Sequence, residues 1–378
     1  MNILVLGGTG AMGRPLVSQL SVANDVFVTT RKKYSPQQKK QNVTYLTGNA
    51  KDMSFLTAAL QSRHWDAVVD FMIWGAEFKV VLPLMLDSTN QYIFISSARV
   101  YAKSDAPITE ETPRLLNVSD DNEYLKTNEY ALAKAREEDM LFHSGRNNYT
   151  IVRPTVTYNS HRLQLGVLEM ENWLYRALHD RSIVFSNDIA DKITTMTHGD
   201  DVARGIASLI GKEGALGEAF HITSSISLPW NDVLDIYLSV LEKHLGHRPH
   251  VVMTDKSTNL KFKNRIYQVI YCRYFNRTFD NDKISRFCDV SSFIEPYSGL
   301  ADCLEKFLEN PTFRDMNWKL EAINDKAAGE WTPLSEIPTM SGKIDYMAYR
   351  YNLEFVIPIT VVAGKIGRKL TSLFKKYR

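Results

Sequence analysis

The sequence predicts an α/β protein built on a doubly wound parallel sheet, with a smaller mixed lobe and a C-terminal helical extension. Short apolar runs that suit buried parallel strands recur between residues 2 and 97. Stretches of helical composition separate these runs, and a glycine-rich turn follows the first of them. The 378 residues, of which 44% are hydrophobic and 23% charged, suffice for a full core in two lobes.

The glycine-rich turn follows the first expected strand, residues 2–6. In the run Gly7–Gly13 the first glycine permits a tight turn, Gly10 lets backbone N–H groups approach a pyrophosphate, and the last lets helix and strand pack closely. The helix that begins near Pro15 favours an anion at its N-terminus. We therefore interpret this segment as a Rossmann-like dinucleotide site rather than an ordinary glycine-rich turn. Its expected cofactor contacts are Gly7, Thr9, Gly10, Ala11, Met12 and Gly13.

Four further strands are expected at residues 25–30, 42–46, 66–71 and 92–97, with helices between them. Right-handed crossovers between parallel strands bring their carboxyl ends to one edge of the sheet, where ligands bind. The other residues expected to border the cofactor at this edge are Asn49, Ala50, Phe71 and Met72.

A basic run, Arg31-Lys32-Lys33, follows the second expected strand. An acid at this point selects NAD by binding the ribose 2′-hydroxyl, whereas Arg accommodates a 2′-phosphate. Because Arg31 and Lys32 stand there without an acid, the sequence favours NADP, with NAD as the alternative. A solvated basic run is the explanation that involves no function.

Ser96 and Ser97 end the fifth expected strand, and Tyr130 and Lys134 lie four residues apart in a segment of helical composition, 130–140. Residues four apart share a helix face, so the ammonium can stand beside the phenol. A neighbouring cation lowers the phenol pKa, ordinarily about 10, toward a useful range. An exposed Tyr and Lys would be the simpler reading, but their place after a strand-end serine in a dinucleotide fold favours a catalytic set.

Five motifs between residues 1 and 245 occur in the order of one family. They are the glycine turn, Ser96–Tyr101, Tyr130 with Lys134, Arg153–Tyr158 and Thr197–Ala203. Together they resemble an extended short-chain dehydrogenase/reductase of the NAD-dependent epimerase/dehydratase type. The resemblance implies that Ser97 orients the substrate, that Tyr130 donates or accepts the proton, and that Lys134 holds the nicotinamide ribose and lowers the Tyr130 pKa. It also implies that Pro154 and Val156 border the nicotinamide.

Departures from the family pattern refine this prediction. Ala131 and Ala133 replace the common Gly and Ser beside the catalytic pair, and both are small. Family dehydratases resemble one another in having Thr-Asp-Glu at the end of the fifth strand. Here Ser97-Ala98-Arg99 brings no carboxylate, which disfavours a 4,6-dehydratase and leaves Arg99 as a substrate candidate. Residues 30–31, 70–74 and 228–230 also resemble an atypical branch that includes chloroplast stem-loop-binding proteins.

The expected domains are a dinucleotide-binding domain at 1–160 with a return segment at about 194–223, a substrate lobe at 161–193 and 224–310, and an extension at 311–378. His161 and Arg162, near the expected mouth, are candidate substrate ligands, whereas Trp173, Tyr175 and Arg176 are expected to be mostly structural. Residues 256–277 are basic with interleaved aromatic side chains. That composition suits a diphosphate-binding lobe, a nucleic-acid face or a solvated helix.

The last residues, 364–378, form an expected amphipathic helix with six Lys and Arg residues and no acid. Such a helix can lie on an anionic membrane surface, and docking on its own domain or on a homodimer partner is the alternative. The apolar run 355–363 is far shorter than the roughly twenty residues that span a bilayer.

The overall composition bounds the remaining function classes. A net charge of +2 argues against a nucleic-acid partner. Cys272, Cys288 and Cys303 are odd in number and lack metal-ligand spacing, so we expect free, mostly buried thiols, no metal site and a reducing compartment. The N-terminus enters the first strand without a leader, so the cytoplasm is the expected location, with the tail as the point of any membrane association.

Two function hypotheses follow. The first is an NAD(P)-dependent epimerase or reductase that acts on a nucleotide-linked sugar, with hydride transfer and Tyr130 as the acid/base. The alternative is an RNA-binding or scaffold protein on the same fold with a structural nucleotide. An intact Ser97, Tyr130 and Lys134 favours the enzyme.

Overall fold

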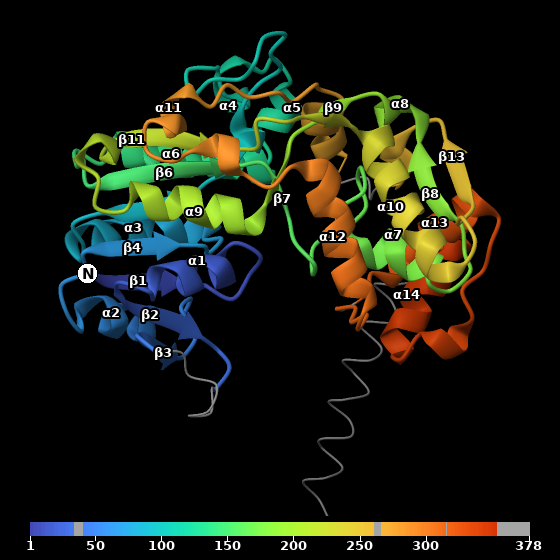
Figure 1. Cartoon of the computed structure of the whole chain (residues 1–378), viewed down its shortest axis with the longest axis horizontal. Helices are drawn as coiled ribbons and strands as arrows, with labels where there is room; N and C mark the ends of the chain where they lie inside the picture. Colours follow the sequence, from blue (N-terminus) through green and yellow to red (C-terminus); the bar gives the residue numbers. More distant parts are fainter. Residues whose placement is uncertain (34–40, 261–265, 315, 354–378) are drawn as a thin grey trace, which may run out of the picture.

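A seven-stranded sheet forms one half of the molecule (Figure 1). The computed structural model describes residues 1–33, 41–260, 266–314 and 316–353. The sheet has the strand order β11-β6-β5-β4-β1-β2-β3, and every pairing in it is parallel. Its strands are β1 Asn2–Leu6, β2 Asp25–Thr30, β3 Val43–Thr47, β4 Ala67–Asp70, β5 Tyr92–Ile95, β6 Tyr149–Pro154 and β11 Glu218–Ile222. The doubly wound parallel sheet predicted from the sequence is confirmed.

Helices cover both faces of this sheet because its strands are apolar on both sides. Ile3 and Val5 of β1 pack with α1 (Gly13–Leu20) and α9 (Gly199–Leu209), while Leu4 and Leu6 pack on the opposite face. The helices of that second face are α2 Met53–Gln61, α3 Phe78–Asp87 and α6 Tyr130–Phe142. From β1 the chain adds β2 and β3 on one side and then crosses back to add β4, β5 and β6 on the other side. The carboxyl ends of β1 and β4 are therefore the switch point at which ligands bind.

The fifth strand is shorter than predicted. β5 ends at Ile95, and Ser97 instead caps a short 3-10 turn, Ala98–Val100, by accepting a hydrogen bond from the Arg99 N–H at 3.2 Å. The chain therefore leaves the sheet two residues earlier, which places the Ser97 side chain beyond the sheet edge.

A second hydrophobic core lies beside the sheet (Figure 1). Its main helices are α7 Met170–Ala177, α10 Trp230–Leu245 and α12 Pro296–Leu308. Two small sheets accompany them, β8 Ile183–Ser186 with β13 Val251–Thr254 in parallel and β9 Ile193–Thr194 with β12 Leu228–Pro229 in antiparallel orientation. Trp173 stacks on Tyr237 in this core with ring centres 4.5 Å apart. Trp173 therefore has the structural role that the sequence predicted.

Shorter elements connect the two halves. The parallel pair β7 Val156–Tyr158 and β10 Met196–His198 runs between them. The remaining short α-helices are α4 Leu115–Val118, α5 Asn122–Leu125, α8 Asn187–Ala190 and α11 Asp282–Ser285. Further 3-10 turns cover Gly75–Glu77, Glu213–Ala215, Ser257–Leu260, Val290–Ser292 and Leu334–Glu336.

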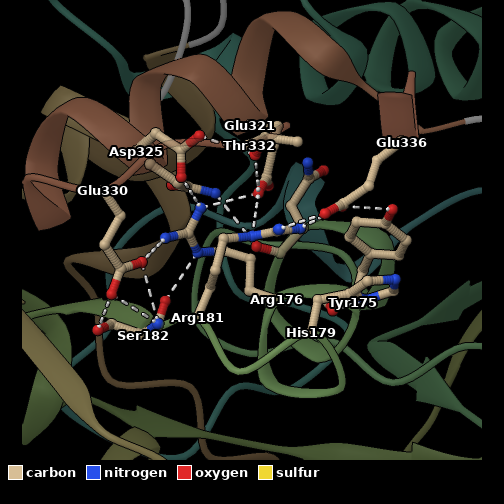
Figure 2. Close-up of polar contacts among 12 residues, drawn as sticks. Tyr175, Arg176, His179, Arg181, Ser182, Glu321, Asp325, Glu330, Thr332 and Glu336 are labelled. Atoms are coloured by element: carbon tan, nitrogen blue, oxygen red, sulfur yellow. Dashed lines mark hydrogen bonds and ion pairs between the residues drawn. The ribbon is translucent and has the colours of Figure 1, made fainter. Parts of the chain in front are cut away.

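The C-terminal extension adds two packed helices, α13 Trp318–Ala328 and α14 Met340–Arg350. A buried ionic cluster attaches them to α7 (Figure 2). The Arg176 guanidinium, which is fully buried, binds Glu321 at 2.8 Å and Asp325 at 2.7 Å on α13 and Glu330 at 2.6 Å. Arg176 thus has a structural role, as expected, and the structure shows that this role is to fix the extension. Residues 355–363 and 364–378, for which we predict an apolar run and an amphipathic helix, lie outside the described residues. No helix in the described ranges combines the length and the apolar character that crossing a bilayer requires.

We expect the stability of this attachment to depend on pH through Glu321. Burial raises the pKa of this carboxyl from its ordinary 4.5 to about 7, against the opposing charge of Arg176, and one of its oxygens has no hydrogen-bond partner among the described residues. Arg181, Asp325 and Thr332 also face it. A folded-state pKa above the unfolded value stabilises the fold at low pH, and this stabilisation is lost as the pH rises through about 7. Each pKa unit corresponds to roughly 1.4 kcal/mol.

Thermal unfolding followed by tryptophan fluorescence between pH 5 and pH 8 (roughly the span from the unfolded to just above the folded pKa) measures this dependence. Glu321→Gln is expected to flatten the profile, because the amide keeps the shape of the side chain and does not titrate. Parallel profiles for the two proteins would show that another group is responsible.

Candidate active site

The glycine turn at the end of β1 has the backbone shape that a pyrophosphate needs. Gly7 has a φ of +75°, which side chains other than hydrogen rarely permit, and its carbonyl accepts a hydrogen bond from the Thr9 N–H at 2.8 Å. A Cβ atom on Gly13 would lie 2.6 Å from the Gly8 backbone, so only glycine allows α1 to start so close to the strand. Around Gly10 no atom of the described residues, apart from Gly10 and its two chain neighbours, lies within 4 Å of the place of a Cβ, which leaves that backbone open to a ligand.

Two adjoining cavities open at this edge of the sheet. The smaller, of about 610 Å³, lies over the glycine turn, and the larger, of about 750 Å³, lies over the ends of β5 and β6. Met12, Phe71 and Arg162 line both, so the two cavities are neighbours that share part of their walls. Each is in the size range of small-molecule sites, and together they have room for a dinucleotide and a substrate.

Most of the predicted site residues line these cavities. The smaller cavity has Gly7, Thr9, Gly10, Ala11, Met12, Gly13, Phe71, His161 and Arg162 in its wall. The larger has Met12, Phe71, Met72, Ser97, Arg99, Tyr130, Lys134, Pro154, Val156 and Arg162. Arg31 and Lys32, beyond the end of β2, and Asn49 and Ala50, beyond the end of β3, are in neither wall. Their contact with the cofactor stays a prediction.

Of the two serines that follow β5, Ser97 has the hydroxyl that remains available to a ligand. The Ser96 hydroxyl donates to the Glu138 carboxylate at 2.6 Å, and Glu138 also accepts two 2.8 Å bonds from Arg153 of β6. This network is buried and ties the end of β5 to α6 and β6. Among the described residues Ser97 accepts a hydrogen bond from the Arg99 N–H and donates none, so its hydroxyl keeps a free donor in the cavity wall.

Tyr130 is placed by the residue before it, which sequence reasoning overlooked. Glu129 caps the N-terminus of α6 by accepting the Ala131 N–H at 2.8 Å, and its carboxylate also pairs with Arg99. The Arg99 guanidinium in turn lies 5.3 Å from the centre of the Tyr130 ring. Negative charge is favourable beside a helix N-terminus, so an acidic residue directly before the expected helix could have indicated this arrangement.

Lys134 lies in the same cavity wall as Tyr130 but has a partner that we did not predict. Its ammonium donates to Glu137 at 2.9 Å and lies 4.4 Å from the centre of the Phe94 ring. The Glu137 carboxylate also accepts the Gly75 N–H at 2.9 Å. Spacing correctly brought Tyr130 and Lys134 to one cavity, yet it is this carboxylate, three residues further on, that binds the ammonium.

A second buried carboxyl, Asp70, lies near Lys134 at the end of β4. Asp70 accepts hydrogen bonds from the Tyr92 hydroxyl at 2.7 Å, from the Trp74 ring N–H at 2.6 Å and from the Met72 N–H at 2.9 Å. Burial raises the pKa of Asp70, and the hydrogen bonds and the charge of Lys134 oppose that effect. These bonds hold Met72, a predicted cofactor contact, at the cavity wall.

The basic and aromatic segment at 256–277 contributes two buried arginines to the larger cavity. Residues 261–265 lie outside the described residues, but Arg273 and Arg277 are buried and line the larger cavity. Tyr271 stacks on Tyr124 with ring centres 4.1 Å apart. Arg273 and Arg277 therefore belong neither to a solvated helix nor to an exposed nucleic-acid face, because both face the cavity, whereas Lys256 is exposed.

The three cysteines lie in the interior of the protein. Cys272, Cys288 and Cys303 are buried and unpaired, as predicted. Among the described residues there is no group of three or more His, Cys, Asp or Glu side chains that could hold a metal ion.

A family model matches residues 3–223, which include the glycine turn, Ser97, Tyr130 and Lys134; it is described as the NAD dependent epimerase/dehydratase family. The chain belongs to this family. Family membership confirms the resemblance drawn from the motifs.

Two curated relatives of this epimerase/dehydratase chain differ in function. It is 29% identical over 242 residues to the chloroplast stem-loop binding protein of 41 kDa b of Arabidopsis thaliana, a match covering 59% of this chain and 58% of the relative. It is 24% identical over 242 residues to 2′-dehydrokanamycin reductase of Streptomyces kanamyceticus, which covers 62% of this chain and 65% of the reductase. The chain thus spans less than two thirds of the length of either.

Solved structures confirm the fold of this family member. UDP-glucuronic acid 4-epimerase from Bacillus cereus, in complex with UDP-glucuronic acid and NAD, superposes with a TM-score of 0.61 at 17% identity over 82% of this chain and 100% of the epimerase. DesIV, a dTDP-glucose 4,6-dehydratase from Streptomyces venezuelae, gives a TM-score of 0.61 at 20% identity over 82% of this chain and 98% of the dehydratase.

Proposed function

We propose that this protein is an NAD(P)-dependent epimerase or reductase that acts on a nucleotide-linked sugar. The observation that carries the proposal is the presence of Ser97, Tyr130 and Lys134 in the wall of one cavity that adjoins the cavity over the glycine turn. Similarity in fold to enzymes solved with UDP-glucuronic acid and with NAD supports the choice of substrate class. Because Ala98 and Arg99 bring no carboxylate to the end of β5, a 4,6-dehydratase is disfavoured.

The residues of the chain suit the proton half of such a reaction. A nicotinamide bound in the cavity would supply hydride transfer to or from a sugar carbon. Ser97 would orient the reacting hydroxyl or carbonyl by a hydrogen bond, and the Tyr130 hydroxyl would give or take the proton on that oxygen. Lys134 would hold the nicotinamide ribose, and Pro154 and Val156 would border the nicotinamide. The shielded position of Lys134, which exposes 2% of its surface, strengthens its electrostatic effect on neighbouring groups.

The function can be tested on the purified full chain. We expect denaturation to release a nicotinamide dinucleotide, which chromatography and mass spectrometry identify. Nucleotide sugars would then be screened for a change in nicotinamide absorbance, which a reductase gives, and for a new stereoisomer without lasting absorbance change, which an epimerase gives. The proposal is wrong if no dinucleotide binds and no nucleotide sugar is converted.

Cofactor preference can be tested at Arg31, which is exposed just beyond β2. We expect tighter binding of NADP(H) than of NAD(H), and we expect Arg31→Asp to reverse this preference, because Arg accommodates a 2′-phosphate and an acid binds the 2′-hydroxyl. The loss of one charge-assisted bond should weaken NADP(H) binding by roughly 10- to 100-fold. Titration of both cofactors measures this, with Lys33→Asp as a control of equal charge change. Equal or better affinity of the unaltered protein for NAD(H) would refute the assignment.

RNA binding is a second candidate because one curated relative is a stem-loop binding protein. The inward direction of Arg273 and Arg277 takes two cations away from any such surface. Filter binding over a salt series distinguishes the candidates, because phosphate contacts lose affinity steeply as salt rises.

We also propose that residues 364–378, outside the described part of the chain, form a membrane-surface helix. Six cations would each contribute on the order of 1 kcal/mol at an anionic surface, in addition to apolar burial. Deleting 364–378 is therefore expected to release the protein from anionic vesicles in co-sedimentation, and high salt should do the same to the full chain. The alternative, docking on the same chain or on a homodimer partner, predicts no vesicle binding and a loss of thermal stability or of the dimer on truncation. Equal sedimentation of both proteins would rule out the membrane role.

A further inference from the structure

Positive charge gathers in one part of the larger cavity, around Cys272. Arg273 follows Cys272 at the end of a π-helical turn, Val269–Arg273, and donates to the Cys272 sulfur at 3.1 Å. Arg277 follows four residues after Arg273, beyond the end of this turn, and Arg99 approaches from the end of β5. All four side chains line the cavity.

Two of these guanidinium groups are buried without a carboxylate. Arg273 is 5% exposed and Arg277 is 7% exposed, and within the described ranges no Asp or Glu forms an ion pair with either. Apart from the Cys272 sulfur, their acceptors are neutral. Arg273 donates to the Gly166 carbonyl and the Gln164 side chain, and Arg277 donates to the carbonyls of Tyr101, Ala102 and Tyr271. Arg99 has one carboxylate, Glu129, so three cations share a single anion.

The cluster therefore has more positive than negative charge. A buried charge is costly unless it is paired, and carbonyl oxygens supply dipoles rather than a counter-charge. The buried Nε atoms of Arg99 and Arg277 have no hydrogen-bond partner in the described part of the chain. Unused donors on buried cations in the wall of a cavity are the expected form of a site for an anionic group of a ligand.

Cys272 is the titratable group on which the charges of all three guanidinium groups act. The carboxylates nearby have other partners, since Glu129 pairs with Arg99 and Glu169 accepts a hydrogen bond from Gln164. Burial raises the pKa of its thiol, and the charges of Arg273, Arg277 and Arg99 outweigh that effect, so the thiol pKa lies below its ordinary value. The other two cysteines differ. Burial raises the pKa of Cys288, and it raises the pKa of Cys303 to about 12.

We propose that Arg99, Arg273 and Arg277 form a subsite for an oxyanion, a carboxylate or a phosphate, on the reacting part of the substrate, and that the Cys272 thiolate occupies it as counter-ion until that substrate binds. The proposal rests on the proposed function for its placement, because Arg99 lies beside Tyr130 and binds Ser97 through its backbone. The pyrophosphate of the cofactor belongs to the other cavity, over the glycine turn. When the oxyanion enters, the thiolate takes a proton from solvent, which conserves the charge of the subsite.

Alkylation of Cys272 by iodoacetamide, a neutral reagent, tests the exchange in the full-length protein. The thiolate is the reacting form, so its neutralisation by a bound anion should slow alkylation about tenfold for each unit by which the thiol pKa rises. Three probes separate the sources of the anion: glucuronate carries a carboxylate, glucose 6-phosphate carries a phosphate, and glucose carries neither. Peptide mass spectrometry follows Cys272, with Cys303 as an internal control that should remain unmodified.

Protection by glucuronate or by glucose 6-phosphate, but not by glucose, supports the subsite and identifies the better anion. Equal protection by glucose, or alkylation that no anion slows, overturns it.

Two variants test the subsite by a direct measurement of anion binding, using calorimetry. Cys272→Asp fixes a carboxylate among the guanidinium groups and should abolish binding of the protecting anion, whereas Cys272→Ser should retain it. If Cys272→Asp binds the anion like the unaltered protein, or if neither anion binds the unaltered protein, the proposal is wrong. None of these measurements uses cofactor or turnover, so their failure is distinct from failure of the proposed function.

Discussion

Replacing Tyr130 by Phe is expected to lower kcat by about 10²–10⁴-fold while the cofactor stays bound, because the substitution removes only the hydroxyl that carries the proton. The phenyl ring keeps its place at the start of α6 beside Arg99, so the shape of the cavity is preserved. Turnover of an identified substrate measures the first effect, and a fluorescence titration with NADPH measures the second.

Tyr158→Phe is a matched control for this experiment. Its hydroxyl is buried, has no hydrogen-bond partner within the described ranges, and belongs to the second core rather than to either cavity wall. Turnover close to normal is therefore expected for this variant. If Tyr130→Phe also retained near-normal turnover, Tyr130 would not be the acid/base, and the role would pass to another group of the cavity.

The parts of the site that the sequence could predict are those fixed by local spacing. The turn at Gly7–Gly13 needs a strand before it and a helix after it, and all three are contiguous in the chain. Tyr130 and Lys134 share a cavity wall because residues four apart share a helix face. Such features depend on short-range geometry alone, and for this reason they can be recognised before the fold is known.

Other parts of the site depend on pairings that local patterns do not contain. The basic and aromatic composition at 256–277 is the same whether Arg273 and Arg277 point to solvent or to the cavity. Their direction is decided by acceptors at Gly166 and at Tyr101, which are 107 and 176 residues away. Glu137 illustrates the same limit at short range, since helix spacing permitted a Lys134 contact with either Tyr130 or Glu137 and the buried surroundings favour the carboxylate.

The ionic cluster that holds the extension lies furthest beyond sequence reasoning. Arg176 meets its three carboxylates across 145 to 154 residues of chain. Nothing near Arg176 in the sequence distinguishes it from an exposed helical arginine, yet it is fully buried. The prediction with the largest expected effect on stability concerns this residue.

Arg176→Met is expected to destabilise the protein by about 3–5 kcal/mol, the typical cost of removing one partner from a buried ion pair. Methionine fills much of the same volume, so lost charge rather than lost packing dominates the effect. Without the guanidinium, the one ion-pair partner that the described residues still offer to Glu321 and Asp325 is Arg181, at 3.6 Å from Glu321. Urea unfolding followed by tryptophan fluorescence reports the change, because Trp318 and Trp331 lie in the extension.

Arg248→Met provides the matched control. Arg248 also pairs with two carboxylates, Asp235 and Glu242, but its side chain is 43% exposed, so its removal should cost no more than about 1 kcal/mol. Adding Glu321→Gln to Arg176→Met should recover part of the lost stability, because it removes one of the three carboxylates that lose their Arg176 partner. Equal losses for Arg176→Met and Arg248→Met, or no recovery in the double variant, would show that burial of the cluster does not determine how firmly α13 is held to α7.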